Sequence, residues 1–312
     1  MRRSRLSYFM AGVLAATVFV MVPATALVMT AVDPSPKTYD GASPSLNVLP
    51  AQFVLGGSLD AAPDPAVDSC DAANNSVPLE MRWTGSDSTS RISGYDVWAS
   101  RWADGVLADE VAHGTSATSY RFFGSNYDAD CGGGVHNTGN YWVVARDNRG
   151  NAAMSGTGIS QWVDVWQEDG ATPTTRSGPL VLSSRTGTWT KSNCACFNWG
   201  KTLYSTVAGA SLTYTVTTQR PGQAVALAVE KNTNRGVMNV SVDGGTSRAV
   251  NTYAATPTHS VRVWQQVITP GTHTITVTNA GTSGRSRVDI DSILLTLQPT
   301  GVTPILASGP GF

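Results

Sequence analysis

The chain carries little charge: only 14% of its 312 residues are charged, with 22 acidic and 21 basic side chains. No basic patch and no run of like charge stands out, which argues against nucleic acid as a partner. No stretch shows the 3.6-residue period of an amphipathic helix. Gly, Thr, Ser and Val are abundant instead, a composition typical of an exported β-protein and not of a helical cytosolic enzyme.

Catalytic signatures are also missing. The four histidines (His113, His136, His259 and His273) form neither an HExxH motif nor a paired metal-ligand spacing. No G-x-S-x-G elbow, P-loop or dinucleotide fingerprint occurs. Asp289 and Asp291 share a strand face and could approach each other as a glycosidase pair. The simpler alternative is that one caps a turn and the other pairs with Arg235. We therefore predict no catalytic residue, no metal and no cofactor.

One long apolar segment lies at the N-terminus, and no second segment of membrane length follows. Basic residues come first, an uncharged apolar run follows, and Ala24-Thr25-Ala26 then stands directly after Pro23. This is the layout of a secretory signal peptide, so we assign residues 1–26 to the leader and predict a secreted, extracellular protein. The alternative is an uncleaved anchor at the membrane, because the run stays mostly apolar to Val32.

After the leader the pattern is that of strands. Residues 27–45 are rich in Pro, Ser and Asp and predict a flexible spacer. Short alternating runs separated by turn residues then predict an antiparallel β-sandwich over 46–168. A Gly/Pro/Thr linker at 169–178 marks a domain boundary. A second set of alternating runs predicts another sandwich over 179–298, with a tail at 299–312. The expected fold class is all-β, with two antiparallel β-sandwiches in tandem.

Three segments of the first domain resemble a bacterial fibronectin type III domain: LEMRW (79–83), ISGYDVW (92–98) and YWVVARDNRGN (141–151). The resemblance implies that Tyr141 is the tyrosine-corner residue, buried with its hydroxyl bonded to backbone. It also implies a spacer or docking role. The domain is long for this family, and the excess lies around residues 101–138.

The second domain resembles the galactose-binding-like jelly roll, similar to carbohydrate-binding modules, that ends many exported actinobacterial proteins. The resemblance rests on four motifs in order: GTWT (187–190), NRGVMNVSVDG (234–244), TPGTHTITV (269–277) and VDIDSILL (288–295). It implies a jelly roll that binds glycan, on a cell wall or an external polysaccharide. Some members hold calcium through a last-strand Asp, a slot that Asp291 fills. The opening strand here has no carboxylate, so we do not predict that site.

A sugar site needs a flat aromatic ring beside convergent polar groups. The candidate ligand-binding residues in the second domain are Trp199, Tyr204, Asn234, Arg235, Asn239 and Trp264. Two alternatives remain open: Arg235 pairs with Asp289 or Asp291, and Trp264 simply packs in the core.

Two rival functions remain open as well. One is a purely structural or adhesion protein without sugar binding. The other is an exported enzyme with an unrecognised site in the 101–138 insertion, which contains Asp104, Asp109, Glu110, His113, Asp128 and Asp130.

The four cysteines are predicted to form two disulfides, because an exported chain meets an oxidising compartment. Three pairings are possible. Domain order favours Cys70–Cys131 and Cys194–Cys196. The second pair needs a tight turn, because residues i and i+2 of an extended strand lie near the upper limit of disulfide Cα spacing. It would pre-set the loop that carries Trp199. A metal site would need further Cys or His nearby, and the segment SNCACFNWG has none.

Overall fold

The computed structural model describes residues 42–56, 77–100, 107–126, 140–156, 158–160, 162–169, 180–197, 200–296 and 305–306. Several predicted features lie outside these ranges: the leader, most of the spacer, the linker and the tail, Cys70, Cys131 and Trp199. The secondary structure of the described residues consists of β-strands, without an α-helix. Nothing in these ranges forms a helix with the length and hydropathy that a membrane span requires.

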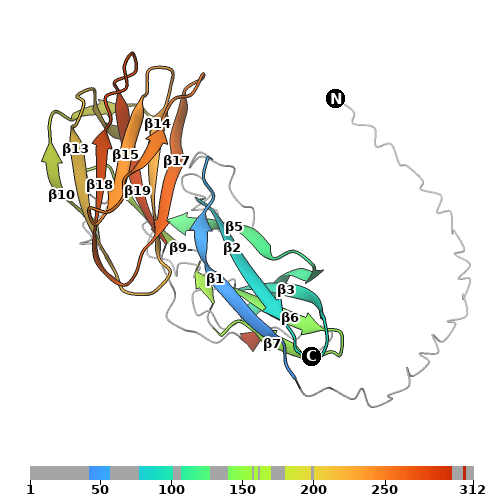
Figure 1. Cartoon of the computed structure of the whole chain (residues 1–312). Helices are drawn as coiled ribbons and strands as arrows, with labels where there is room; N and C mark the ends of the chain where they lie inside the picture. Colours follow the sequence, from blue (N-terminus) through green and yellow to red (C-terminus); the bar gives the residue numbers. More distant parts are fainter. Residues whose placement is uncertain are drawn as a thin grey trace, which may run out of the picture. The chain divides into compact units, whose positions relative to one another are not determined.

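The described residues of the first sandwich form strands β1 to β9, most of which are labelled in Figure 1. They are β1 (Ser45–Phe53), β2 (Val77–Ser86), β3 (Ile92–Ser100), β4 (Leu107–Thr115), β5 (Ser119–Asn126), β6 (Asn140–Asp147), β7 (Ala152–Met154), β8 (Ile159–Ser160) and β9 (Trp162–Gln167). One antiparallel sheet has the order β1-β2-β5, and the other has the order β4-β3-β6-β7 with β8 beside β6. A short strand near the C-terminus, β20 (Ile305–Leu306), pairs with β4.

Alternation along the strands builds the core of this sandwich. On β2, Leu79, Met81 and Trp83 are all buried, and the Trp83 ring meets Tyr95 edge-on with centroids 5.7 Å apart. Tyr141 is buried as well, with its ring centroid 4.2 Å from that of Phe122. The predicted fibronectin-type identity and the role of the Tyr141 hydroxyl stay predictions.

The second sandwich contains ten strands of its own. They are β10 (Leu180–Thr186), β11 (Thr190–Asn193), β12 (Lys201–Ser205), β13 (Ser211–Thr218), β14 (Ala224–Lys231), β15 (Val237–Val242), β16 (Arg248–Asn251), β17 (Thr258–Val267), β18 (Gly271–Asn279) and β19 (Val288–Thr296). One sheet has the order β10-β13-β18-β15-β16. In the other, β19 lies between β12 and β14, with β11 and β17 outside them.

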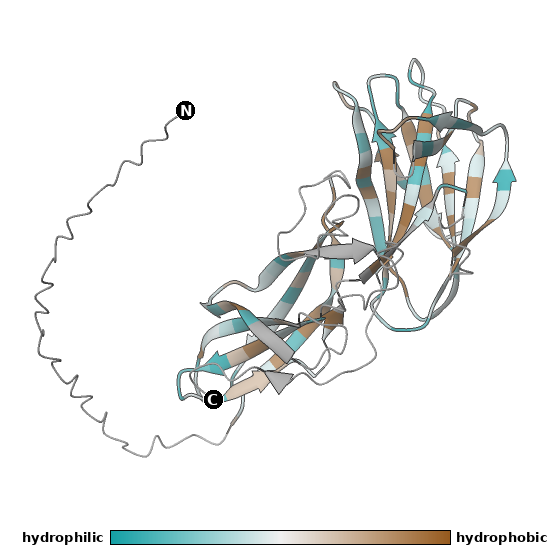
Figure 2. Ribbon diagram, turned by 180° about the vertical axis from the view of Figure 1, so that it is seen from behind, coloured by the Kyte–Doolittle hydropathy of each residue, from teal (hydrophilic) through white to brown (hydrophobic). Residues whose placement is uncertain are grey.

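The period of two is regular in this sandwich, as the alternating bands along its strands in Figure 2 show. On β13, Leu212, Tyr214 and Val216 are fully buried, whereas the intervening threonines face outward. The outward Thr213 lies opposite Thr276 of β18, with hydroxyl oxygens 3.2 Å apart. Branched side chains pack well on a pleated surface, so these sequences favour strands. The predicted all-β class with two antiparallel sandwiches is confirmed.

Strand β9 belongs to both sandwiches. It pairs antiparallel with β19 from Val163↔Thr296 to Gln167↔Ser292, and its first residues pair with the end of β5. The core of the first sandwich also takes in residues of the second, namely Ala224, Ala226, Ala228 and Leu294. The outer face of the β14–β19 region is therefore buried as well as its inner face, because the first sandwich packs against it.

Candidate functional site

Three loops meet at one end of the second sandwich, where the chain crosses between its sheets: 232–236, 252–257 and 280–287. We call them the loop cluster. The Gly236 amide donates to the Arg287 carbonyl at 2.8 Å, and the Thr252 amide donates to the Gly236 carbonyl at 2.9 Å. The Asn232 amide donates to the Thr252 carbonyl at 3.3 Å. These backbone bonds tie all three loops together, so their outer residues stand on a rigid base.

Gly236 is the junction of the loop cluster. A Cβ atom at this position would collide with the Arg285 carbonyl oxygen and come within 2.9 Å of the Thr282 side chain. The Thr282 hydroxyl also accepts the Val237 amide at 2.8 Å. Close backbone approach is a common reason for glycine at a loop junction. The Arg-Gly step at 235–236 therefore serves loop packing.

Tyr253 is the exposed aromatic residue of the loop cluster, with 41% of its surface accessible. The Arg285 guanidinium lies 4.7 Å from its ring centroid, a cation–π distance. Tyr253 forms a backbone bridge with Asn232, and Asn234 is exposed in the same turn as Asn232. An open ring, an arginine and amide side chains thus lie together. Sequence reasoning missed Tyr253; the available signal was a lone aromatic in the turn-rich segment NTYAATPT.

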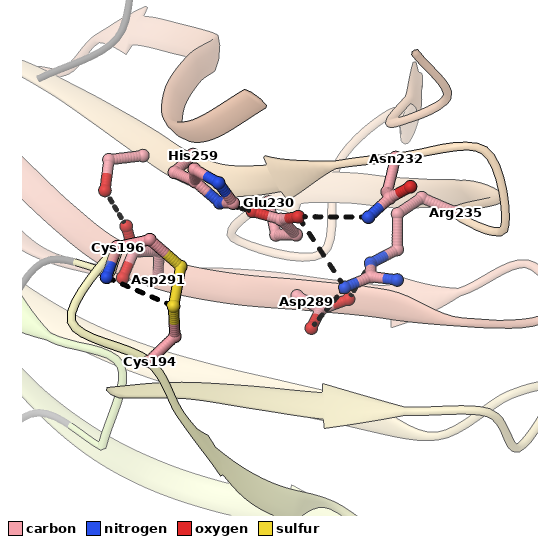
Figure 3. The surroundings of a disulfide bond; sticks show 9 residues. Cys194, Cys196, Glu230, Asn232, Arg235, His259, Asp289 and Asp291 are labelled. Atoms are coloured by element: carbon pink, nitrogen blue, oxygen red, sulfur yellow. Dashed lines mark hydrogen bonds and ion pairs between the residues drawn. A yellow bond between two sulfur atoms is a disulfide. The ribbon is translucent and has the colours of Figure 1, made fainter. Parts of the chain in front are cut away.

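A network of buried charges lies beneath these loops, as Figure 3 shows. Arg235 is 5% exposed, and its Nε lies 2.5 Å from Oδ2 of the fully buried Asp289. Arg287 donates to Oδ1 of the same carboxylate at 2.6 Å. Its guanidinium also lies 3.8 Å from the ring centroid of Tyr204. Burial lowers the pKa of Arg235, although Asp289 favours its charged form. A carboxylate that bonds two arginines in this way fixes the positions of all three side chains.

The network continues to the neighbouring strands. His259 Nδ1 lies 2.5 Å from Oε2 of the buried Glu230, and the Phe197 ring stands edge-on to His259 at 5.9 Å. The Ser260 hydroxyl donates to Asp291, which is fully buried. Phe197 belongs to the β11–β12 hairpin, in which a disulfide joins Cys194 to Cys196 with Cα atoms 5.0 Å apart (Figure 3). The hairpin therefore contacts the edge of the charge network.

Three of the predicted site residues lie at the loop cluster or in its base. Asn234 accepts a hydrogen bond from Arg235, and Tyr204 contacts Arg287. Of the two partners left open for Arg235, the structure shows Asp289. In this structure both Arg235 and Tyr204 support the surface and do not form its outer layer, since Arg235 is buried and Tyr204 is half-buried.

The other predicted residues lie elsewhere. Trp264 is 4% exposed inside the apolar core, where it packs and is not accessible to a ligand. Asn239 belongs to β15 in the opposite sheet, across from Thr278. Trp199 lies outside the described residues. His273, within the motif TPGTHTITV, has its Nδ1 2.7 Å from Oδ2 of Asp243.

Within the described residues, a cluster of polar residues lies where β4 of the insertion pairs with β3. Asp96, Glu110 and His113 each offer a ligand atom, and these atoms lie within 4.8 Å of one another. The fully buried Asp96 already accepts the Arg146 Nε at 2.5 Å and the Gly114 amide at 2.9 Å. A cation here would face the Arg146 guanidinium. Asp104, Asp128 and Asp130 lie outside the described residues.

Comparisons with known proteins give structural matches only. No family model and no curated protein matches this chain. A family 35 carbohydrate binding module from Clostridium thermocellum is 16% identical and aligns over 43% of this chain and 98% of its own, with a TM-score of 0.32. The CBM35 from Cellvibrio japonicus Abf62 is 13% identical and aligns over 44% of this chain and 94% of its own, with a TM-score of 0.33. The CBM6 of LamC, a laminarinase module from Zobellia galactanivorans, is 9% identical and aligns over 43% of this chain and 99% of its own, with a TM-score of 0.30.

Proposed function

We propose that this protein binds carbohydrate through the loop cluster, with Tyr253 as the stacking ring. The observation that carries the proposal is the exposure of Tyr253, a residue 41% accessible, on loops that backbone hydrogen bonds hold together. A sugar presents an apolar C–H face beside its hydroxyl groups. A flat aromatic with nearby amide donors and acceptors suits both parts.

Polar side chains that could bond the hydroxyl groups of a sugar lie on the same loops as Tyr253 or next to them. Asn234 and Thr233 are exposed in the turn that follows β14, and Asn251 is exposed before Tyr253. Arg285 occupies one side of the ring and adds donors beside it. The buried Arg235–Asp289 pair holds this surface in place, which reduces the ordering cost of binding.

The remaining parts of the proposal come from the sequence. The leader would export the protein, and the first sandwich, with its fibronectin-type motifs, would serve as a spacer or docking module. No catalytic step is proposed. The glycan would belong to a cell wall or an external polysaccharide.

The test is pull-down of the full exported chain on insoluble polysaccharides, together with a glycan array. We expect Tyr253→Ala to reduce retention at least about tenfold, the order that loss of one anchoring aromatic produces at a binding site. Tyr253→Phe, which keeps the ring, should retain most binding. Val267→Ala is the matched control, since Val267 is also exposed on the second sandwich, at 42%.

Two results would count against the proposal. Absence of binding to any glycan would favour the structural or adhesion role. Binding that survives Tyr253→Ala would place the sugar elsewhere, even with the function correct.

A further inference from the structure

A second candidate site lies on the outer face of the β1-β2-β5 sheet of the first sandwich, where Gln265 of β17 in the second sandwich also contributes to the lining. Here a pocket of about 310 Å³ is lined by Leu49, Leu55, Arg82, Arg121 and Gln265, among others. The pocket is distinct from the loop cluster, because none of its lining residues belongs to those three loops. Its size is near the lower end of the range for small-ligand sites.

An irregularity in β1 helps to form the pocket. The pairing of β1 with β2 runs from Ser45 to Leu49, slips, and resumes at Gln52. Pro50 lies inside the slip, and among the strands that the structure describes β1 pairs only with β2, so β1 is an edge strand. Bulges re-aim side chains at sheet edges and next to binding sites. The slip lies at Leu49 and Pro50, which both line the pocket.

The charged wall of the pocket has an excess of positive charge. Glu80 accepts the Arg82 Nε at 2.8 Å through one oxygen and the Arg121 Nε at 3.0 Å through the other. The two arginine side chains remain 67% and 70% exposed, whereas Glu80 is only 14% exposed. One carboxylate thus positions two guanidinium groups, leaving a net charge of +1 on the wall. Arginine pairs of this kind suit a carboxylate ligand.

The rest of the lining is aliphatic and amide. Leu49 and Leu55 are 44% and 45% exposed, and they form an aliphatic part of the lining that a ligand can reach. Gln265 is held by its Oε1, which accepts the Phe53 amide at 2.7 Å, so its NH₂ group remains as a donor for a ligand. Phe53 itself is 2% exposed, so this pocket offers no open aromatic face on which a sugar would stack.

We propose that this pocket binds the free carboxylate end of a peptide whose last residues have small aliphatic side chains. The carboxylate would lie on Arg82 and Arg121, the aliphatic groups on Leu49 and Leu55, and a peptide carbonyl on the NH₂ group of Gln265. Two sources share this chemistry, the stem peptides of a bacterial cell wall and the C-termini of proteins. The inference goes beyond the proposed glycan function and does not depend on it.

The test is calorimetric titration of the full chain with Nα,Nε-diacetyl-lysyl-D-alanyl-D-alanine. We expect binding of the acid and at least about tenfold weaker binding of the same peptide with a C-terminal carboxamide, because charge-assisted bonds to the arginines are lost. The all-L peptide ending in alanine distinguishes the sources: tighter binding of the D-form indicates cell wall, and tighter binding of the L-form indicates protein termini.

Arginine variants locate the site. Arg82→Ala with Arg121→Ala should abolish the difference between acid and carboxamide, whereas Arg82→Lys with Arg121→Lys should keep part of it, since the charge remains but the fork geometry is lost. Arg149→Ala is the matched control, because it removes one exposed positive charge on the same sandwich away from the pocket. Circular dichroism would verify that each variant is folded.

The proposal is overturned if the acid and the carboxamide bind equally, if neither peptide binds, or if the folded double alanine variant still binds the acid. Tighter binding of galacturonate trimer than of the peptide would also overturn it in favour of a sugar-acid site. Tyr253→Ala separates the two proposals: peptide binding should be unchanged in this variant, whatever happens to glycan binding.

Discussion

At the scale of single residues, Arg235 shows how a candidate contact can turn out to be a support. The sequence placed it at the entrance of a strand, where either a ligand or a carboxylate could accept its hydrogen bonds. In the structure its partner is the fully buried Asp289, and its own exposure is 5%. Burial lowers the pKa of Arg235 because its charged form loses water. A carboxylate partner offsets much of the cost of burying this charge.

We predict that Arg235→Ala destabilises the protein by about 3 kcal/mol, because removal of one partner leaves Asp289 with less compensation in the interior. Chemical denaturation followed by tryptophan fluorescence measures the change. Arg248→Ala, an exposed arginine on β16, should change the free energy of unfolding by less than about 0.5 kcal/mol. Equal effects of the two variants would contradict the structural role of Arg235.

His273 and Asp243 should make stability depend on pH. The hydrogen bond to Asp243 raises the pKa of His273 above its usual 6.5. The same bond lowers the pKa of Asp243 below its usual 3.8. The contribution of His273 to the free energy of unfolding is fully present below pH 6.5, and it is lost as the pH rises through the raised pKa of His273. The contribution of Asp243 to the free energy of unfolding is fully present above pH 3.8, and it is lost as the pH falls through the lowered pKa of Asp243.

We therefore expect the pair to stabilise the protein most between about pH 4 and pH 6.5, by about 0.5 kcal/mol, the order for a partly exposed ion pair. Thermal unfolding of wild type and His273→Asn from pH 4 to pH 8 measures this. The difference in melting temperature between them should shrink toward pH 8. A difference that is constant over this range would show that the pair does not titrate as described.

At the scale of elements, the loop cluster depends on one glycine. The Gly236 amide donates a hydrogen bond to one neighbouring loop, and its carbonyl accepts one from the other. A Cβ atom at Gly236 would collide with the Arg285 carbonyl. The hairpin β15–β16 shows a different use of turn residues: Asp243 and Gly244 both have positive φ, 51° and 67°. An Asp-Gly pair suits that left-handed turn. The turn at Asp243-Gly244 follows from two adjacent residues and can be predicted from sequence, whereas the junction at Gly236 depends on a contact with Arg285, which is distant in sequence.

We predict that Gly236→Ala destabilises the second sandwich by about 2 kcal/mol, the cost of overpacking a tight contact. It should also weaken glycan binding, because Tyr253 and Asn232 depend on the same junction. Denaturation and pull-down assays measure the two effects. Gly156→Ala is the control, since a Cβ there meets nothing within 4 Å. If Gly236→Ala lowers stability but leaves binding intact, the loop cluster is not the glycan site.

At the scale of the whole molecule, the two sandwiches are joined by more than a linker. Strand β9 pairs with β19, and Ala224, Ala226 and Ala228 of β14 belong to the core of the first sandwich. The Arg262 Nε donates to the Val54 carbonyl at 2.9 Å, and burial lowers the pKa of Arg262 to about 10. Shared pairing and a shared core predict that the described sandwiches unfold together.

Calorimetry of the protein should therefore show one main unfolding transition. We predict that Ala226→Glu, which buries an unpaired charge in the shared core, lowers the stability of the whole protein by about 3 kcal/mol or more. Ala249→Glu is the control, because Ala249 is an exposed strand residue on β16. Two separate transitions, only one of which responds to Ala226→Glu, would contradict this coupling.

The sequence by itself determined the all-β class, the two sandwiches and the inward residues of their strands, because a period of two depends only on neighbouring residues. Only the tertiary structure decided that Trp264 packs in the core, that Arg235 is buried, and that Tyr253 is the exposed ring. It alone showed that the alanines of β14 are covered. These outcomes depend on which strands and loops, distant in sequence, pack against a given face, and alternation within one strand carries no information about that.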